Sequence, residues 1–164
     1  MAQPIPQLDF VTAVKLAIAR IKDMEGRSRR SEFWWTMLAL FIVNIILAFI
    51  PFGWILSLIL WVCTIPLQCR RLHDIGKGNT MIYIYSGVYV LTLILSKYQS
   101  YLAEKALKSF DFSAASTHDS LVIPMIIVGL AALVLGIILL IWFVKDSQPG
   151  TNQYGPSPKY PDFQ

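Results

Sequence analysis

Apolar residues gather in four long stretches that contain no charged side chain. These stretches cover residues 33–50, 54–69, 81–96 and 121–144. A helix needs about 20 predominantly apolar residues to cross the hydrocarbon core of a bilayer. The first and fourth stretches reach this length, and the other two reach it when a flanking turn is added. The pattern predicts an all-α polytopic membrane protein with spans at about 33–50, 54–72, 80–97 and 121–144.

The segment at residues 1–32 precedes the first span and is polar overall. It is too long for the n-region of a signal peptide, and no small-x-small cleavage site follows the first apolar stretch. We therefore expect an uncleaved span. Within the segment, Val11, Val14, Ile18 and Ile21 share one helical face, and Asp9 stands where an N-cap would. This spacing predicts an amphipathic helix that lies in the membrane interface, packs on the ends of the spans, or does both.

The distribution of Lys and Arg predicts the orientation of the chain. Eleven of the 14 lie in the N-terminal segment, the loop after the second span and the C-terminal tail at 145–164. The other three are Lys97, at the end of the third span, and Lys105 and Lys108 in the loop at 98–120. This loop also contains an amphipathic YLAEKALKSF stretch that predicts a short separate helix. By the positive-inside rule, both termini are cytoplasmic and the loop 98–120 is periplasmic. The pI of about 9.1 then follows from topology and from attraction to anionic lipid, without nucleic acid as a partner.

Two charged clusters flank the first pair of spans, GRSRRSE at 26–32 and RRLHD at 70–74. Only three residues, at 51–53, join these spans, so both clusters must lie at the same cytoplasmic boundary. We expect Glu32 to pair with Arg70 or Arg71 across the helices. If the second span continues to Asp74, the spacing also predicts an i, i+4 pair between Arg70 and Asp74.

Arginines outnumber the acidic residues in these clusters by five to two. Guanidinium groups bind phosphate through paired hydrogen bonds, so the excess predicts a site for an anionic lipid headgroup, a ligand or a partner. The simpler interpretation is positive-inside charge together with an ion-paired helix end. The candidate binding residues are Arg27, Arg29, Arg30, Arg70, Arg71 and His73, with Glu32 and Asp74 as structural ion pairs and Asn152 and Tyr154 of the tail as a cover.

Catalytic and metal-binding patterns are weak in this sequence. His73 and Asp74 are adjacent, and neighbours on a helix diverge by about 100°. There is no GxSxG or HExxH motif, and Cys69 with His73 supplies only two of the ligands that a zinc site requires. We therefore expect no enzyme, cofactor or metal. A membrane-bound enzyme that uses His73 is one alternative.

A second alternative is an oligomeric transporter or channel, and a homo-oligomer is possible in any case. Asn44 is the one strongly polar residue near the middle of a span. It predicts a hydrogen bond between helices or, on the transport hypothesis, part of a path together with the tyrosines of the third span.

Three segments of the chain resemble the signatures of a known family. These are GRSRRSEFWW at 26–35, RRLHDIG at 70–76 and PGTNQYGPSP at 149–158. Their order and the four-span layout are similar to those of the bacterial inner-membrane family named domain of unknown function 805. The resemblance implies a location in the inner membrane and three cytoplasmic segments that act together. It implies no reaction, because the activity of that family is not established.

Overall fold

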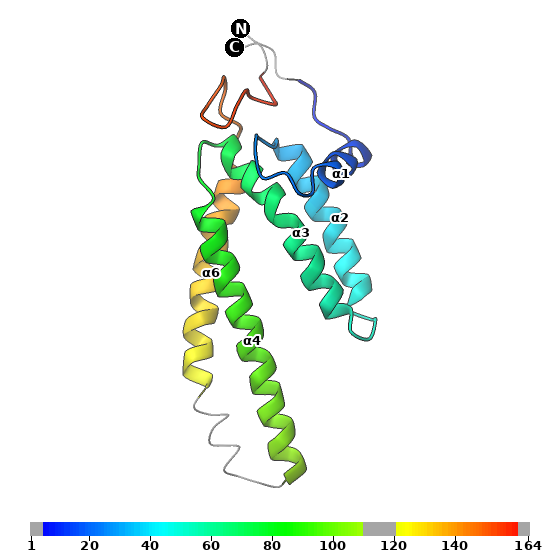
Figure 1. Cartoon of the computed structure of the whole chain (residues 1–164), viewed down its shortest axis with the longest axis vertical. Coiled ribbons are helices and arrows are strands. Elements are labelled where there is room, and N and C mark those ends of the chain that lie inside the picture. Colours follow the sequence, from blue (N-terminus) through cyan, green and yellow to red (C-terminus); the bar gives the residue numbers. More distant parts are fainter. Residues whose placement is uncertain (1–4, 110–120, 161–164) are drawn as a thin grey trace. The chain divides into compact units, whose positions relative to one another are not determined.

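The computed structural model describes residues 5–109 and 121–160, and all regular secondary structure in these ranges is helical. The helices, shown in Figure 1, are α1 (Phe10–Ala19), α2 (Arg30–Leu47), α3 (Gly53–Asp74), α4 (Thr80–Ser109) and α6 (Val122–Val144). Within the described ranges, α2, α3, α4 and α6 are the four helices long and apolar enough to cross a membrane. The prediction of an all-α fold with four spans and a short N-terminal helix is confirmed.

The chain divides into two compact units, and each is described separately. The first comprises Met1–Asn79 and Ile141–Gln164, and therefore contains α1, α2, α3, the end of α6 and the C-terminal segment. The second comprises Thr80–Leu140 and contains α4 and the remainder of α6. All three signature segments lie in the first unit.

Helix α1 packs beside α2 (Figure 1), and the small residues Ala13 and Ala17 are buried in this contact region. Asp9 is its N-cap as predicted, and its side chain accepts a hydrogen bond from the Thr12 backbone N–H at 3.0 Å. The helix ends at Ala19, and Arg70 Nη1 donates to the Arg20 and Asp23 carbonyls of the turn that follows.

A tight turn joins α2 to α3 and makes them an antiparallel hairpin. Phe52 has a left-handed backbone with φ of 61°, and the Gly53 N–H donates to the Ile50 carbonyl at 2.9 Å. A Cβ atom on Gly53 would lie 1.9 Å from the Leu47 carbonyl oxygen, so only glycine fits there. The hairpin returns the chain to the level where α2 began, and α3 continues beyond its apolar stretch to Asp74.

Asn44, on α2, does not form the predicted hydrogen bond to another helix. Its Nδ2 donates to the Leu40 carbonyl of the same helix at 2.8 Å. A backbone carbonyl one turn earlier is always within reach of a short polar side chain, so the amide needs no partner on another helix.

Helix α4, in the second unit, is longer than predicted. It has 30 residues, whereas we expected a span at 80–97 followed by a separate short helix. Its sequence from 97 to 109 contains no glycine or proline to end the helix. A helix of this length extends about 45 Å, which exceeds the roughly 30 Å of the hydrocarbon core. The remainder of the predicted loop, residues 110–120, lies outside the described residues.

Candidate functional site

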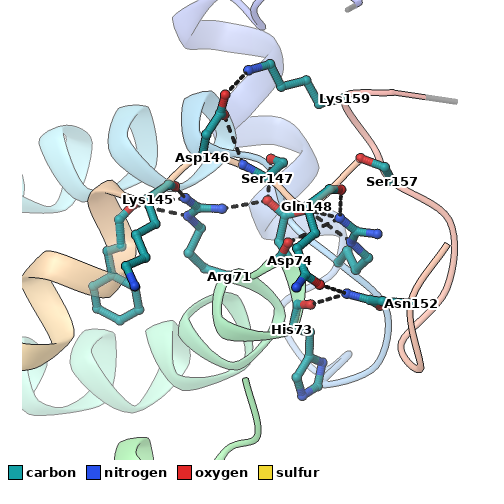
Figure 2. A network of polar contacts seen from close by, with 12 residues as sticks. Arg71, His73, Asp74, Lys145, Asp146, Ser147, Gln148, Asn152, Ser157 and Lys159 are labelled. Carbon is teal, nitrogen blue, oxygen red and sulfur yellow. Dashed lines mark hydrogen bonds and ion pairs between the residues drawn. The ribbon is translucent and has the colours of Figure 1, made fainter. Parts of the chain in front are cut away.

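The carboxylate of Asp74, at the end of α3, lies at the centre of a buried polar network (Figure 2). Its side chain is fully buried. Arg27 Nε donates to Oδ1 at 3.1 Å, and Arg71 Nη1 donates to Oδ2 at 2.5 Å. The Ser147 hydroxyl group donates a short hydrogen bond to Oδ2. The Asp74 carboxylate therefore accepts hydrogen bonds from two arginines and also binds the segment that follows α6.

Arg71 connects α3 to the end of α6. Its Nε and Nη2 donate to the Phe143 carbonyl at 3.2 and 3.1 Å, and Nη2 also donates to the Lys145 carbonyl (Figure 2). The last carbonyl groups of a helix have no partner within the helix and carry a partial negative charge. The Arg71 guanidinium satisfies these groups at the C-terminus of α6, and Asp74 compensates its charge.

Arg27 holds the C-terminal segment against the first unit. Its Nη2 donates to the Gln148 carbonyl at 2.5 Å and to the Asp74 carbonyl at 3.1 Å. Its Nη1 donates to the carbonyls of Gly150 and Gly155 at 2.8 and 3.3 Å. Asp74 belongs to the signature segment 70–76, and Gly150 and Gly155 belong to the segment 149–158. Because Arg27 itself lies in the segment 26–35, its guanidinium group joins all three signature segments.

Arg70 has one of the two carboxylate partners predicted for it. Its Nη2 lies 3.3 Å from Glu32 Oε1, so the predicted pairing of Glu32 with Arg70 or Arg71 is confirmed. Its Nη1 donates to the carbonyls of Arg20 and Asp23. The predicted i, i+4 pair between Arg70 and Asp74 is wrong, because these acceptors direct Arg70 away and leave Asp74 to Arg71 and Arg27.

His73 belongs to the contact between α3 and the tail. Its ring lies parallel to the Tyr154 ring with centroids 3.7 Å apart, and Nδ1 lies 3.0 Å from the Gly26 carbonyl oxygen. A carbonyl oxygen only accepts, so Nδ1 carries the proton. Asn152 Nδ2 donates to the His73 backbone carbonyl at 2.9 Å (Figure 2). Asn152 and Tyr154 therefore cover His73 in the manner expected of the tail.

Arg29 and Arg30 line a cavity of about 370 Å³ at the start of α2. Arg29 Nη2 donates to the Ile5 and Pro6 carbonyls at 2.9 and 2.8 Å, which leaves its charge uncompensated by a carboxylate. The Arg30 side chain is exposed and has no hydrogen-bond partner among residues 5–109 and 121–160. The other residues around this cavity are Gln7, Ser31, Trp34, Trp35, Leu38, Asp146, Ser147 and Lys159.

An ion pair borders the cavity on the side of the C-terminal segment. Lys159 Nζ lies 2.5 Å from Asp146 Oδ2 (Figure 2). Burial, the largest single cause, disfavours the charged form of both groups. Their mutual hydrogen bond, further hydrogen bonds and the attraction of opposite charges together outweigh it, so the pKa of Asp146 is lowered and that of Lys159 is raised. The cavity therefore has three cationic side chains and one carboxylate, a net charge of about +2 before any ligand is present.

The described residues contain no group of three or more His, Cys, Asp or Glu side chains placed to hold a metal ion. His73 and Cys69 are both buried, but they supply only two donors.

The fold and the buried network define an integral membrane protein whose first helical hairpin and C-terminal segment are joined by arginines. Residues 21–156 match the family described as Protein of unknown function (DUF805), and the chain belongs to this family. No curated protein and no solved structure matches it.

The structure brings the predicted residues together but divides them into two groups. Arg27, Arg70, Arg71, Glu32 and Asp74 form the buried network, whereas Arg29 and Arg30 face the cavity. Reasoning from sequence missed Ser147, Gln148, Asp146 and Lys159. Their one available signal was their position beside the PGTNQYGPSP signature. Nothing in their residue types marks them as partners of α2 and α3.

Proposed function

We propose that this chain is a multi-pass protein of the bacterial inner membrane, with both termini in the cytoplasm. We propose that it acts without catalysis and binds a phosphate-bearing anion, foremost the headgroup of an anionic lipid. The cavity at the start of α2 would hold that group. The observation that carries this proposal is the exposed Arg30 guanidinium, which has no hydrogen-bond partner within the described ranges and lines a cavity of net positive charge.

The surroundings of Arg30 support a lipid headgroup in particular. Trp34 and Trp35 line the same cavity and are each 37% exposed. Tryptophan favours the headgroup depth of a bilayer, where its ring is in the apolar region and its N–H can remain hydrogen-bonded. Trp35 Nε1 donates to the Leu8 carbonyl at 3.0 Å, so its polar edge is already satisfied. A cationic group beside two tryptophan rings would suit a lipid headgroup, because the phosphate lies just above the hydrocarbon of the bilayer.

The buried arginines are less suited to this role. Arg70 and Arg71 are fully buried, and Arg27 is 5% exposed. Each donates most of its hydrogen bonds to backbone carbonyls or carboxylates of the first unit. Releasing one of them to a ligand would leave those acceptors unpaired in the interior, which is costly. The binding role is therefore assigned to Arg30, and the buried arginines, including Arg29 at 7% exposed, support it.

Counting bound phosphatidylglycerol by native mass spectrometry tests this function. The wild type is compared with Arg30→Gln and with Lys22→Gln, which removes the same charge from another exposed position. A charge-assisted hydrogen bond contributes about 1.5–3 kcal/mol, so we expect Arg30→Gln to weaken binding by roughly tenfold or more. Non-specific attraction contributes about 1 kcal/mol per cation near the surface, or roughly fivefold, for either variant.

Equal losses in the two variants would contradict a specific site. Titration with inorganic phosphate distinguishes the source of the anion. Displacement of phosphatidylglycerol by millimolar phosphate would favour a soluble ligand, and persistence of the lipid would favour the headgroup. A fusion of alkaline phosphatase to the C-terminus tests the topology, since an active fusion would place that terminus in the periplasm.

A further inference from the structure

A second cavity, of about 220 Å³, lies between α1, α2 and α3 in the first unit. It shares no lining residue with the cavity around Arg30. Its walls are aliphatic except for Cys63 and the hydroxyl groups of Thr36 and Thr64. Ile18 and Ile21 line it from α1 and the turn after it, Ala39 and Val43 from α2, and Leu60 and Cys63 from α3.

The polar groups in the wall are already satisfied. The Thr36 hydroxyl donates to the Glu32 carbonyl at 2.7 Å. The Thr64 hydroxyl donates to the Trp61 carbonyl at 2.6 Å and accepts from Gln68 Nε2 at 2.7 Å. The wall offers no free hydroxyl proton, and no charged side chain lines it. The occupant that fits such a surface is a hydrocarbon, since a polar group entering it would lose its hydrogen bonds to water.

The size of the cavity limits the shape of that hydrocarbon. One turn of an α-helix with its side chains, about 10 Å across and 5.4 Å long, occupies roughly 400 Å³. The cavity is about half that volume, so a second helix does not enter it. At roughly 30 Å³ for a group about the size of a water molecule, the volume corresponds to about seven such groups. A single flexible chain satisfies both limits.

The position of the cavity identifies the source of such a chain. Two walls belong to helices that are long and apolar enough to cross a membrane, and α1 supplies the third. Ile18 on α1 is 62% exposed, and Ile21 beyond it is 39% exposed. Apolar surface left in water costs about 25 cal/mol per Å². In a bilayer, the hydrocarbon available to cover these residues is the acyl chain of a lipid.

We propose that the groove between α1 and the α2–α3 hairpin binds one acyl chain of a membrane lipid. Helix α1 forms one side of the groove and holds the chain against Ala39 and Cys63. The lipid is a diacyl phospholipid, because its acyl chains form the hydrocarbon core of the bilayer that α2 and α3 are long enough to cross. This site is independent of the anion site around Arg30, so either proposal can fail without the other.

Photo-crosslinking in vesicles tests the proposal. The intact protein is reconstituted into phosphatidylcholine and phosphatidylglycerol that carry a diazirine on one acyl chain. After irradiation, the labelled residues are mapped by mass spectrometry. Ala39→Phe fills the groove, and Ile46→Phe places the same ring on an exposed position of α2 outside it.

We expect labelling of the wild type to concentrate on the residues that line the groove, chiefly Ala39, Leu40 and Val43 of α2 and Leu60, Cys63 and Leu67 of α3. Because Ala39→Phe places a ring in the groove and leaves less room for a chain, it should reduce this labelling about fivefold or more, whereas Ile46→Phe should leave it unchanged. Labelling spread evenly over exposed positions such as Phe41 and Ile46, or unaffected by Ala39→Phe, would overturn the proposal. The wild-type map decides the question alone if Ala39→Phe does not fold.

Lipid extracted from the purified wild type identifies the source. One retained phospholipid per chain supports the site, whereas a retained fatty acid without phospholipid would contradict the phospholipid as its occupant. A Cys63–Cys63 cross-link between two copies would instead show that the groove faces another chain, and would contradict the proposal.

Discussion

Each buried arginine in this protein finds most of its acceptors on the backbone. Arg71 donates to two carbonyls at the end of α6, Arg70 to two in the turn after α1, and Arg27 to four in all. Carbonyl groups satisfy most of the donors without neutralising the charge, and Arg70 Nε is a buried donor without a partner among the described residues. Four arginines in this part of the chain are buried, and the carboxylates of Asp74 and Glu32 pair with three of them, whereas Arg29 donates to the Ile5 and Pro6 carbonyls.

Asp74→Asn tests this balance. The substitution keeps the size of the side chain but leaves Arg27 and Arg71 without their carboxylate in a buried site. Removing one partner of a buried ion pair costs about 3–5 kcal/mol, so we expect a loss of that order in unfolding free energy, measured by thermal unfolding in mild detergent. Asp146→Asn is the matched control, because the 48% exposed Asp146 pairs with Lys159 near the surface and such pairs contribute about 1 kcal/mol or less. Equal losses would contradict a special role for Asp74.

Asp23, which lies outside the candidate spans, provides a test of how stability depends on pH. A hydrogen bond from Arg20 lowers the pKa of Asp23, and the Glu25 N–H and the charges of Arg20 and Arg70 act in the same direction. Because the folded-state pKa is depressed, the stabilisation is present above the usual aspartate range and is lost as pH falls through the folded value. An NMR titration of Asp23 should show this low midpoint. Arg20→Gln should raise it, and Lys22→Gln should change it little. An unchanged midpoint in Arg20→Gln would contradict the assigned cause.

At the scale of elements, the α2–α3 hairpin determines where the charged clusters meet. Its turn places the start of α2 and the end of α3 at one level, which brings Glu32 within 3.3 Å of Arg70. A longer or looser turn would permit the helices to slide, and the fixed partners of Arg70 and Arg27 would be lost.

Gly53→Ala tests the turn. The new methyl group would lie 1.9 Å from the Leu47 carbonyl oxygen, so the backbone must move. Overpacking of this kind costs about 1–3 kcal/mol, and we expect a corresponding fall in thermal stability. Gly87→Ala is the control, because a Cβ there has no atom within 4 Å and alanine favours the helix. A Gly53→Ala protein as stable as Gly87→Ala would show that the turn relaxes without cost.

At the scale of the whole first unit, the C-terminal segment is part of the fold. Its described residues, 145–160, form no helix, but Arg27 donates to the Gln148 and Gly150 carbonyls, and the Gln148 N–H donates to the Asp74 carbonyl at 3.0 Å. The Asn152 side-chain amide donates to the His73 carbonyl. The N-terminal segment joins the same assembly, since the Ile5 N–H donates to the Lys159 carbonyl at 3.0 Å. The three signature segments are thus one structural group.

Arg27→Lys tests that group. A lysine keeps the charge but cannot reproduce a planar fork whose three nitrogens donate to Asp74 and to three carbonyls of the C-terminal segment. We expect the C-terminal segment to detach more often, so that trypsin cleaves after Lys145 and Lys159 several-fold faster, in line with a loss of about 1–2 kcal/mol. Arg30→Lys is the control, since Arg30 has no hydrogen-bond partner in the part of the chain that the structure describes. Equal cleavage of the two variants would contradict the role of Arg27.

The amino-acid sequence by itself determined the features that depend on neighbouring residues. The four apolar stretches predict the spans, Asp9 predicts the start of α1, and the three-residue connection predicts that Glu32 meets Arg70 or Arg71. Each of these features follows from local residues alone, because its physical cause is hydrophobicity for the spans, capping for α1 and loop length for the ion pair.

Only the tertiary structure decided which acceptors the arginines use. Backbone carbonyls occur at every position, so nothing in the sequence marks those of Phe143, Gln148 or Gly150 as partners. The Arg20 and Asp23 carbonyls direct Arg70 away from Asp74, and the Gln148 and Gly150 carbonyls bind the C-terminal segment to Arg27. They also separate the buried arginines from Arg30. The sequence predicted an excess of positive charge at this boundary, and the packing of distant segments determined which of those charges remain available.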